Sequence, residues 1–142
     1  GMEIVFQNRS PVDDGAGVGG RQLDSVAEVC GSSDFVSLHC AATPETLHIL
    51  GREALATMSP SAYVINTARG DVVDEDALVA ALESGAIGGA GLDVFQGEPK
   101  VNPAIIAAPN TVLLPHLGSA TEETRVAMGM KVVDNVRNRG SS

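Results

Sequence analysis

Short apolar runs bounded by polar residues recur along this chain and alternate with longer segments of helical spacing. Runs of about four to eight such residues are typical of strands buried on both faces in a parallel sheet. The clearest example is DFVSLHC at residues 34–40, which is apolar almost throughout. Together the runs predict strands at residues 3–7, 34–40, 62–67, 89–95 and 111–115.

The segments between the first strands place apolar residues three or four positions apart, as helices do. This spacing predicts a short helix within residues 23–30. A second helix is predicted at residues 43–51, with Thr43 as its N-cap and Pro44 in its first turn. Residues 52–58 are expected to extend it by a turn or two.

Three further helical segments are predicted in the second half of the chain. Residues 74–84 present one apolar face, and Gly85 is the expected end of that helix. The loop after the fourth strand has room for one helical turn at residues 104–107. Ser119 and Glu122 form a possible capping box for the final helix. That helix carries one apolar stripe, made of Val126, Met130, Val133 and Val136.

Strands that alternate with helices predict an α/β fold with a doubly wound parallel sheet. The 142 residues, of which 44% are apolar, suffice for one domain with a buried core, so we expect residues 1–142 to form a single α/β domain.

Composition and charge narrow the classes of partner. The net charge is −9 and the chain has no cluster of Lys or Arg, so neither nucleic acid nor a membrane is expected as a partner. No segment reaches the ~18 apolar residues of a membrane span, and no signal peptide precedes the first strand. The spacing of Cys30 and Cys40 matches no metal site, so we expect buried free thiols, no metal and a cytoplasmic location.

Three polar residues of complementary chemistry follow successive predicted strands. Arg69, Glu98 and His116 each lie where a strand gives way to a loop, and such strand ends can meet in one crevice of an α/β sheet. A guanidinium binds a carboxylate through a planar fork of donors, and an imidazole can donate a proton to a carbonyl oxygen. A carboxylate beside the imidazole orients the ring and favours its charged form. This trio predicts the reduction of a 2-keto acid.

Four sequence strings resemble one enzyme family. They are LHCAATPET, VINTARGDVVDEDALVAALESGAIGGAGLDVF, GEP and PHLGSAT, and the likeness runs from residue 3 to about residue 138. They resemble the D-isomer-specific 2-hydroxyacid dehydrogenases, and within them the glyoxylate/hydroxypyruvate reductases. The resemblance implies an oxidoreductase in which Arg69 binds substrate, His116 is the acid/base and Glu98 is the carboxylate that pairs with it.

The resemblance also implies residues that bind the cofactor. Asp93 matches the family's aspartate near the nicotinamide carboxamide, and Gly118 lets the backbone approach the nicotinamide. The segments that line the cofactor match His39, Cys40, Thr67 and Ala68.

The end of the first strand indicates which dinucleotide is used. NAD-dependent members carry an acid there that binds the ribose 2′-hydroxyl. Here the strand ends in Asn8, Arg9 and Ser10, and an arginine with a hydroxyl suits a 2′-phosphate. The sequence therefore favours NADP as the cofactor.

The chain departs from the family in one large respect. The family's G-x-G-x-x-G turn would precede Met2, and the glycine-rich stretch at residues 15–20 reads as a flexible loop. The family's substrate domain is also missing from the sequence. We therefore expect the C-terminal part of a dinucleotide-binding domain (a Rossmann-type half), inactive when isolated.

The strand that the family places at the centre of the sheet is missing as well. Two arrangements of the remaining strands are open, and we favour the first, with which a dimer can coexist. The strand at residues 3–7 can move into the vacant slot, with residues 21–23 outside it, which produces the flavodoxin-like order 2-1-3-4-5. Alternatively a second copy pairs edge to edge, and the stripe of the final helix is a candidate surface for a homodimer.

Two hypotheses about function remain open. The first is part of an NADP(H)-dependent reductase of 2-keto acids such as glyoxylate and hydroxypyruvate. The second is a non-catalytic, flavodoxin-like module for folding or self-association, favoured by the missing glycine-rich turn because pyrophosphate then has no helix N-terminus to bind. A third class, the dehydrogenase-related co-repressors, is disfavoured by PHLGSAT.

Overall fold

The computed structural model describes residues 1–12 and 19–139 of the chain. Most of the glycine-rich stretch at residues 15–20 lies outside the described residues, and so does its interpretation as a loop.

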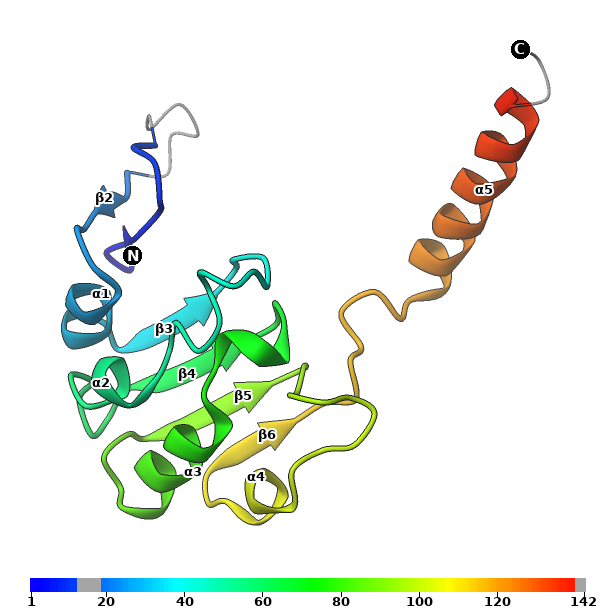
Figure 1. Cartoon of the computed structure of the whole chain (residues 1–142). Helices are drawn as coiled ribbons and strands as arrows, with labels where there is room; N and C mark the ends of the chain where they lie inside the picture. The colour runs from blue at the N-terminus through cyan, green and yellow to red at the C-terminus, as the bar shows by residue number, and fades with distance from the viewer. Residues whose placement is uncertain (13–18, 140–142) are drawn as a thin grey trace.

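A parallel sheet of four strands forms the centre of the molecule (Figure 1). Its strands are β3 (Phe35–Leu38), β4 (Tyr63–Asn66), β5 (Gly89–Leu92) and β6 (Thr111–Leu113), paired in that order. Each observed strand falls within a predicted apolar run and is shorter than it. The predicted α/β class with parallel strands is confirmed.

Helices α1 to α4 cover one face of this sheet (Figure 1). The connections from β3 to β4, β4 to β5 and β5 to β6 all lead to the next strand in the same direction across the sheet. Because such crossover connections are right-handed, their helices lie on the same face of the sheet. The helices are α1 (Val26–Ser32), α2 (Arg52–Leu55), α3 (Glu75–Glu83) and α4 (Pro103–Ala107).

The core lies between these helices and the sheet. Alternate strand residues such as Val36, Val64 and Leu92 point into it and are buried, as is Leu78 of α3. The intervening residues face the other way, and Phe35, Tyr63 and Val112 are 61%, 42% and 65% exposed. This second face is not covered by a helical layer among the described elements, in contrast to the two layers expected of a doubly wound sheet. The rings of Phe35 and Tyr63 stack on it with centroids 5.6 Å apart.

Side-chain caps begin two of the helices that cover the sheet before its last two strands, α1 and α3. Ser25 caps α1 and Asp74 caps α3, each accepting from a backbone N–H of the first turn. Gly85 follows α3 with φ +69°, a left-handed conformation that glycine adopts at low cost, so the predicted end of this helix is confirmed.

The predicted helix at residues 43–51 is wrong. The segment forms successive turns, and the helix begins only at Arg52. The Thr46 hydroxyl donates to Ala41 O at 2.6 Å and accepts from the Thr43 N–H at 2.8 Å. His48 has φ 52°, which is incompatible with a right-handed helix. Local side-chain bonds of this kind compete with helix formation.

The predicted strand order 2-1-3-4-5 is also wrong. Strands β1 (Val5–Phe6) and β2 (Arg21–Gln22) pair in parallel, but they form a separate two-stranded sheet. Each contributes only two residues to a ladder, which is short for filling the edge beside the four residues of β3. The Gln22 side chain instead holds this pair to its own loop, donating to Asn8 O at 3.0 Å and accepting from the Val12 N–H at 3.0 Å.

The last helix, α5 (Glu122–Arg139), extends away from the sheet (Figure 1). The predicted capping box with Ser119 is wrong: the helix follows Thr121, whose hydroxyl accepts from the Thr124 N–H at 3.2 Å. Large apolar residues of α5 are between 40% and 69% exposed, namely Val126, Met128, Met130, Val132, Val133 and Val136. Among the described residues, no helix has the length and apolar character needed to cross a membrane.

Candidate active site

The three residues predicted from strand ends lie at one edge of the sheet. Arg69 follows β4, Glu98 lies in the loop after β5 and His116 follows β6. These three strands are neighbours and parallel, so their carboxyl ends share an edge. The sheet topology therefore brings the three loops together.

Glu98 and His116 form a direct pair. Glu98 Oε2 accepts a hydrogen bond from His116 Nδ1 at 2.8 Å, although 18 residues separate them. The other oxygen, Oε1, accepts from the Phe95 N–H at 2.8 Å. The bond from His116, and secondly the one from Phe95, lowers the pKa of Glu98 below its ordinary value. An ionised Glu98 holds the proton on Nδ1 and leaves Nε2 to exchange a proton with a ligand.

Asp93 organises the loop that carries His116. Its side chain is only 6% exposed, and its oxygens accept from the Leu117 N–H at 2.7 Å and the Gly118 N–H at 2.8 Å. A Cβ at Gly118 would lie 3.2 Å from Asp93 Oδ2, so a side chain there would crowd the carboxylate. The loop also holds His116 at φ 58°, a left-handed conformation that is uncommon for residues other than glycine.

The turn that presents Arg69 is held by Asn66, whose contribution the sequence did not reveal. The Asn66 side chain is buried, donates to Arg69 O at 2.9 Å and accepts from the Ala68 N–H at 3.0 Å. Arg69 itself is exposed, and its Nη1 donates to Ala68 O at 2.6 Å. An amide residue ending an apolar strand was the available signal, since a buried polar group needs partners.

Gly70 brings the Arg69 turn against the loop that leads to Glu98. A Cβ at this position would fall well inside 3.0 Å of the backbone of Phe95 and Gln96, so only glycine fits. No local pattern in the sequence distinguishes this contact from an ordinary turn glycine.

Glu75 is a second buried carboxylate near this edge. Its side chain is 4% exposed and its Oε1 accepts from the Gln96 N–H at 2.7 Å. Burial raises the pKa of Glu75 above its ordinary value, opposed by the hydrogen bond from Gln96. Gln96 Nε2 in turn donates to His48 Nε2 at 2.7 Å. From the sequence this glutamate looks like a residue that only favours the start of α3.

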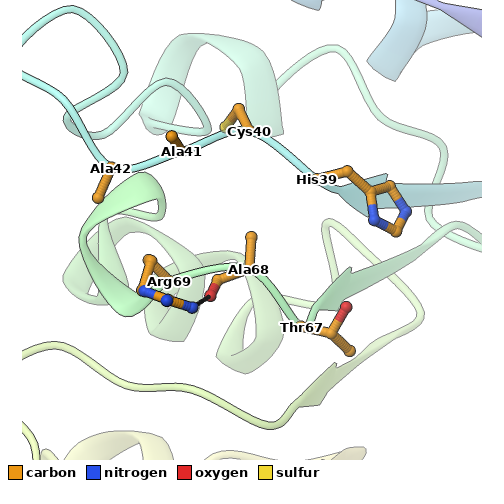
Figure 2. A pocket seen from close by; sticks show the side chains of 7 residues that line it. All are labelled: His39, Cys40, Ala41, Ala42, Thr67, Ala68 and Arg69. Atoms are coloured by element: carbon orange, nitrogen blue, oxygen red, sulfur yellow. Dashed lines mark hydrogen bonds between the residues drawn. The ribbon is translucent and has the colours of Figure 1, made fainter. Parts of the chain in front are cut away.

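A groove of about 510 Å³ opens between the ends of β3 and β4 (Figure 2). Figure 2 shows two loops facing each other across it. The loop after β3 and the loop after β4 contribute His39, Cys40, Ala41, Ala42, Thr67, Ala68 and Arg69. All four residues predicted to line a cofactor are therefore in this lining, together with Arg69.

The size and lining of this groove are those of a ligand site. Its volume lies in the range of about 300–1,000 Å³ that is usual for ligand sites. Three of its lining residues are alanines, whose small side chains leave the main chain accessible to a planar ring. His39 is exposed, and its Nε2 lies 2.9 Å from the Ser37 hydroxyl.

The predicted 2′-phosphate residues lie elsewhere. Asn8, Arg9 and Ser10 follow β1 and are exposed, and they are not part of the groove lining. Asn8 Nδ2 donates to Ser10 O at 3.0 Å, so the three residues form a local turn. The structure thus brings together Arg69 with the groove residues and Glu98 with His116, and it leaves Asn8–Ser10 on the separate two-stranded unit.

Cys30 and Cys40 are free thiols. Cys30 is fully buried, as predicted, and burial raises its pKa to about 11, whereas Cys40 is only partly buried. Within residues 1–12 and 19–139, no three His, Cys, Asp or Glu side chains are grouped so that they could hold a metal ion.

Residues 1–118 match the family model described as "D-isomer specific 2-hydroxyacid dehydrogenase, NAD binding domain". The chain is 43% identical over 136 residues to a glyoxylate reductase of Thermococcus litoralis. It is 44% identical over 137 residues to a glyoxylate/hydroxypyruvate reductase B of Enterobacter agglomerans. Each alignment covers 96% of this chain, and 41% and 42% of those proteins respectively.

The fold is similar to solved structures of the same group. An NADPH-dependent glyoxylate/hydroxypyruvate reductase of Sinorhizobium meliloti, in complex with NADP and malonate, matches with a TM-score of 0.92 and 38% identity. The match covers 100% of this chain and 44% of that one. The chain therefore spans less than half the length of the relatives it matches.

Proposed function

Because the chain belongs to the D-isomer specific 2-hydroxyacid dehydrogenase family, as part of its NAD-binding domain, we propose that it carries the proton-transfer and carboxylate-binding residues of a 2-keto acid reductase. The substrates proposed are glyoxylate and hydroxypyruvate, after the names of its relatives. The observation that carries the proposal is the Glu98–His116 hydrogen bond of 2.8 Å at the edge that also presents Arg69.

Each residue has a role that follows from its contacts. His116 Nε2 donates a proton to the keto oxygen, while Glu98 holds Nδ1–H and stabilises the charged ring. The Arg69 guanidinium exchanges its bond to Ala68 O for the two oxygens of the substrate carboxylate. A bound reduced nicotinamide would supply the hydride.

NADP is the proposed cofactor. Asn8, Arg9 and Ser10 offer a cation and polar side chains to a 2′-phosphate, with no acid among them to bind a free ribose hydroxyl. The Sinorhizobium meliloti relative is NADPH-dependent. His39, Cys40, Thr67 and Ala68 would contact the cofactor in the groove, and Asp93 and Gly118 would lie near its nicotinamide.

Calorimetric titration with NADPH and NADH tests the cofactor. We expect saturable binding of NADPH in the micromolar range and weaker binding of NADH. Replacing Asn8-Arg9 by Ala-Asp should reverse this preference, whereas Arg125→Ala on α5 should leave it unchanged. An unaltered preference in the Ala-Asp variant would contradict the phosphate-binding role, and no binding at millimolar NADPH would contradict cofactor binding by this chain.

Malonate, a dicarboxylate without a keto group, tests the role of Arg69. NMR titration in the presence of NADPH should shift the backbone amides of Ala68 and Arg69. Arg69→Met should abolish these shifts, and Arg52→Met, which removes an exposed arginine from α2, should retain them. Equal responses in both variants would contradict carboxylate binding by Arg69.

A second candidate function, self-association, is favoured by two uncovered apolar surfaces. The described part of α5 has no buried residue, and the outer face of the sheet exposes Phe35, Tyr63 and Val112. Exposed apolar surface that is larger than scattered single residues is typical of interaction sites. A homodimer in which such surfaces are covered is therefore proposed as the alternative.

Sedimentation over a range of concentrations tests this alternative. Val133→Glu should lower the association constant because it places a charge in the stripe, whereas Asn135→Glu on the same helix should have little effect. A monomer at every concentration would exclude self-association and leave the reductase proposal intact.

A further inference from the structure

Asp93 is joined to the two residues that follow His116. It comes directly after β5, and its own N–H donates to Asn66 O at 2.9 Å, which continues the ladder between β4 and β5. Its carboxylate reaches across to the loop after β6 and accepts from Leu117 and Gly118, 24 and 25 residues further along the chain. A rigid strand end is thus fastened to the loop that carries the imidazole.

The loop needs such a fastening because its backbone is strained. His116 has φ 58°, and a residue with a Cβ is destabilised in the left-handed region by contact with its own backbone. Such conformations persist only where the surrounding structure holds them. The next two N–H groups are the ones that Asp93 binds, and both bonds are short and made to a charged acceptor.

We propose that Asp93 is a positioning residue: it holds His116 opposite Glu98 by binding the backbone of Leu117 and Gly118. The importance of this for catalysis rests on the reductase function proposed above. The hydrogen bonds from Leu117 and Gly118 to Asp93 do not depend on that function, because they can be observed in the free protein.

The charge of Asp93 makes the proposal testable through Glu98. The negative charge of Asp93 by itself raises the pKa of Glu98 slightly, whereas the hydrogen bond from His116 is the largest cause that lowers it. If Asp93 acted only through its charge, removing that charge would lower the pKa of Glu98. If it positions His116, its removal would displace the ring and raise that pKa.

The experiment compares Asp93→Asn and Asp93→Ala with Asp134→Asn, a control on the exposed helix α5. The Glu98 carboxyl is titrated by ¹³C NMR, and hydrogen exchange is measured at the amides of Leu117 and Gly118. In Asp93→Ala we expect about tenfold faster exchange at both amides and a higher Glu98 pKa. Asp93→Asn keeps one acceptor oxygen, so it should free only one amide.

Amides of β4 and β5 in the same spectra show whether each variant is folded. Should Asp93→Ala not fold, Asp93→Asn and Gly118→Ala, whose Cβ would crowd Asp93 Oδ2 at 3.2 Å, provide the same readouts. An unchanged or lower Glu98 pKa with protected amides would overturn the positioning role. The amide exchange of Leu117 and Gly118 and the Glu98 pKa can change as expected in a chain that binds neither NADPH nor malonate. That result would support the positioning role of Asp93 and contradict the reductase function.

Discussion

Gly70→Ala should destabilise the protein and disturb the candidate site at the same time. Gly70 lies where the Arg69 turn meets the backbone of Phe95 and Gln96, and an added Cβ would fall well inside 3.0 Å of that backbone. Carbon atoms in contact need about 3.5 Å, so the two loops would have to separate by roughly 1.5 Å. Neither side can yield by rotating a side chain, because the atoms in contact are backbone.

The size of the effect follows from this overlap. Overpacking costs about 1–3 kcal/mol, and contact with backbone places Gly70→Ala near the upper end. Alanine also restricts the unfolded chain, which returns about 0.4–1 kcal/mol. We therefore expect a net loss of about 2 kcal/mol, which corresponds to a fall of about 1 M in the urea midpoint for a slope near 2 kcal/mol/M.

Urea unfolding followed by circular dichroism measures this loss. Gly129→Ala is the matched control, because a Cβ at that position of α5 would meet nothing within 4 Å, and alanine there should favour the helix. The displaced loop also carries the Phe95 N–H bond to Glu98, so the Glu98 pKa should rise in Gly70→Ala. A midpoint equal to that of the wild type would refute the close approach of the two loops.

Substitutions at three other residues test separate contacts. His116→Ala should raise the Glu98 pKa in an NMR titration. In the wild type, the lowered pKa of Glu98 adds stability at pH values above the pKa of Glu98 in the unfolded chain, and this stability is lost as the pH falls through the pKa of Glu98 in the folded protein. The urea midpoint of His116→Ala should therefore depend less on pH in the acid range. Glu75→Gln should gain stability relative to wild type as pH rises, since the raised pKa of Glu75 means that its ionisation opposes folding; a constant difference from acid to neutral pH would refute this. Asn66→Ala should cost about 1–3 kcal/mol in urea unfolding, because the Ala68 N–H loses its side-chain acceptor and Arg69 O keeps only the longer bond, of 3.4 Å, from the Val72 N–H; Asn66→Asp, which keeps the bond from Ala68, should lie between it and wild type.

The chain's local patterns were sufficient for most elements and for the family. Each strand of the main sheet lies within a predicted apolar run, and α3 lies within the predicted residues 74–84 and ends before Gly85, as expected. The motif strings around Arg69 and His116 identified the family that residues 1–118 match. These features depend on neighbours in sequence, whose side-chain spacing and backbone preferences act within one turn or one strand.

Errors arose where a local preference competed with other contacts. Thr43 and Pro44 resemble a helix start, but the Thr46 hydroxyl and the left-handed His48 hold the segment in turns. Whether β1 pairs with β3 or only with β2 depends on which strand edges meet in the folded chain, and the apolar pattern of the sequence does not specify this pairing.

By itself the sequence determined that Arg69, Glu98 and His116 follow successive strands, and that Asp93 is an acid within an apolar run. Only the tertiary structure decided that Glu98 bonds to His116, that Asp93 holds the loop after it, and that Gly70 lies against Phe95. The physical reason is distance along the chain: 18 to 25 residues separate the partners of these two hydrogen-bonded contacts. Such partners meet only after parallel pairing of β4, β5 and β6 has fixed the relative positions of their loops.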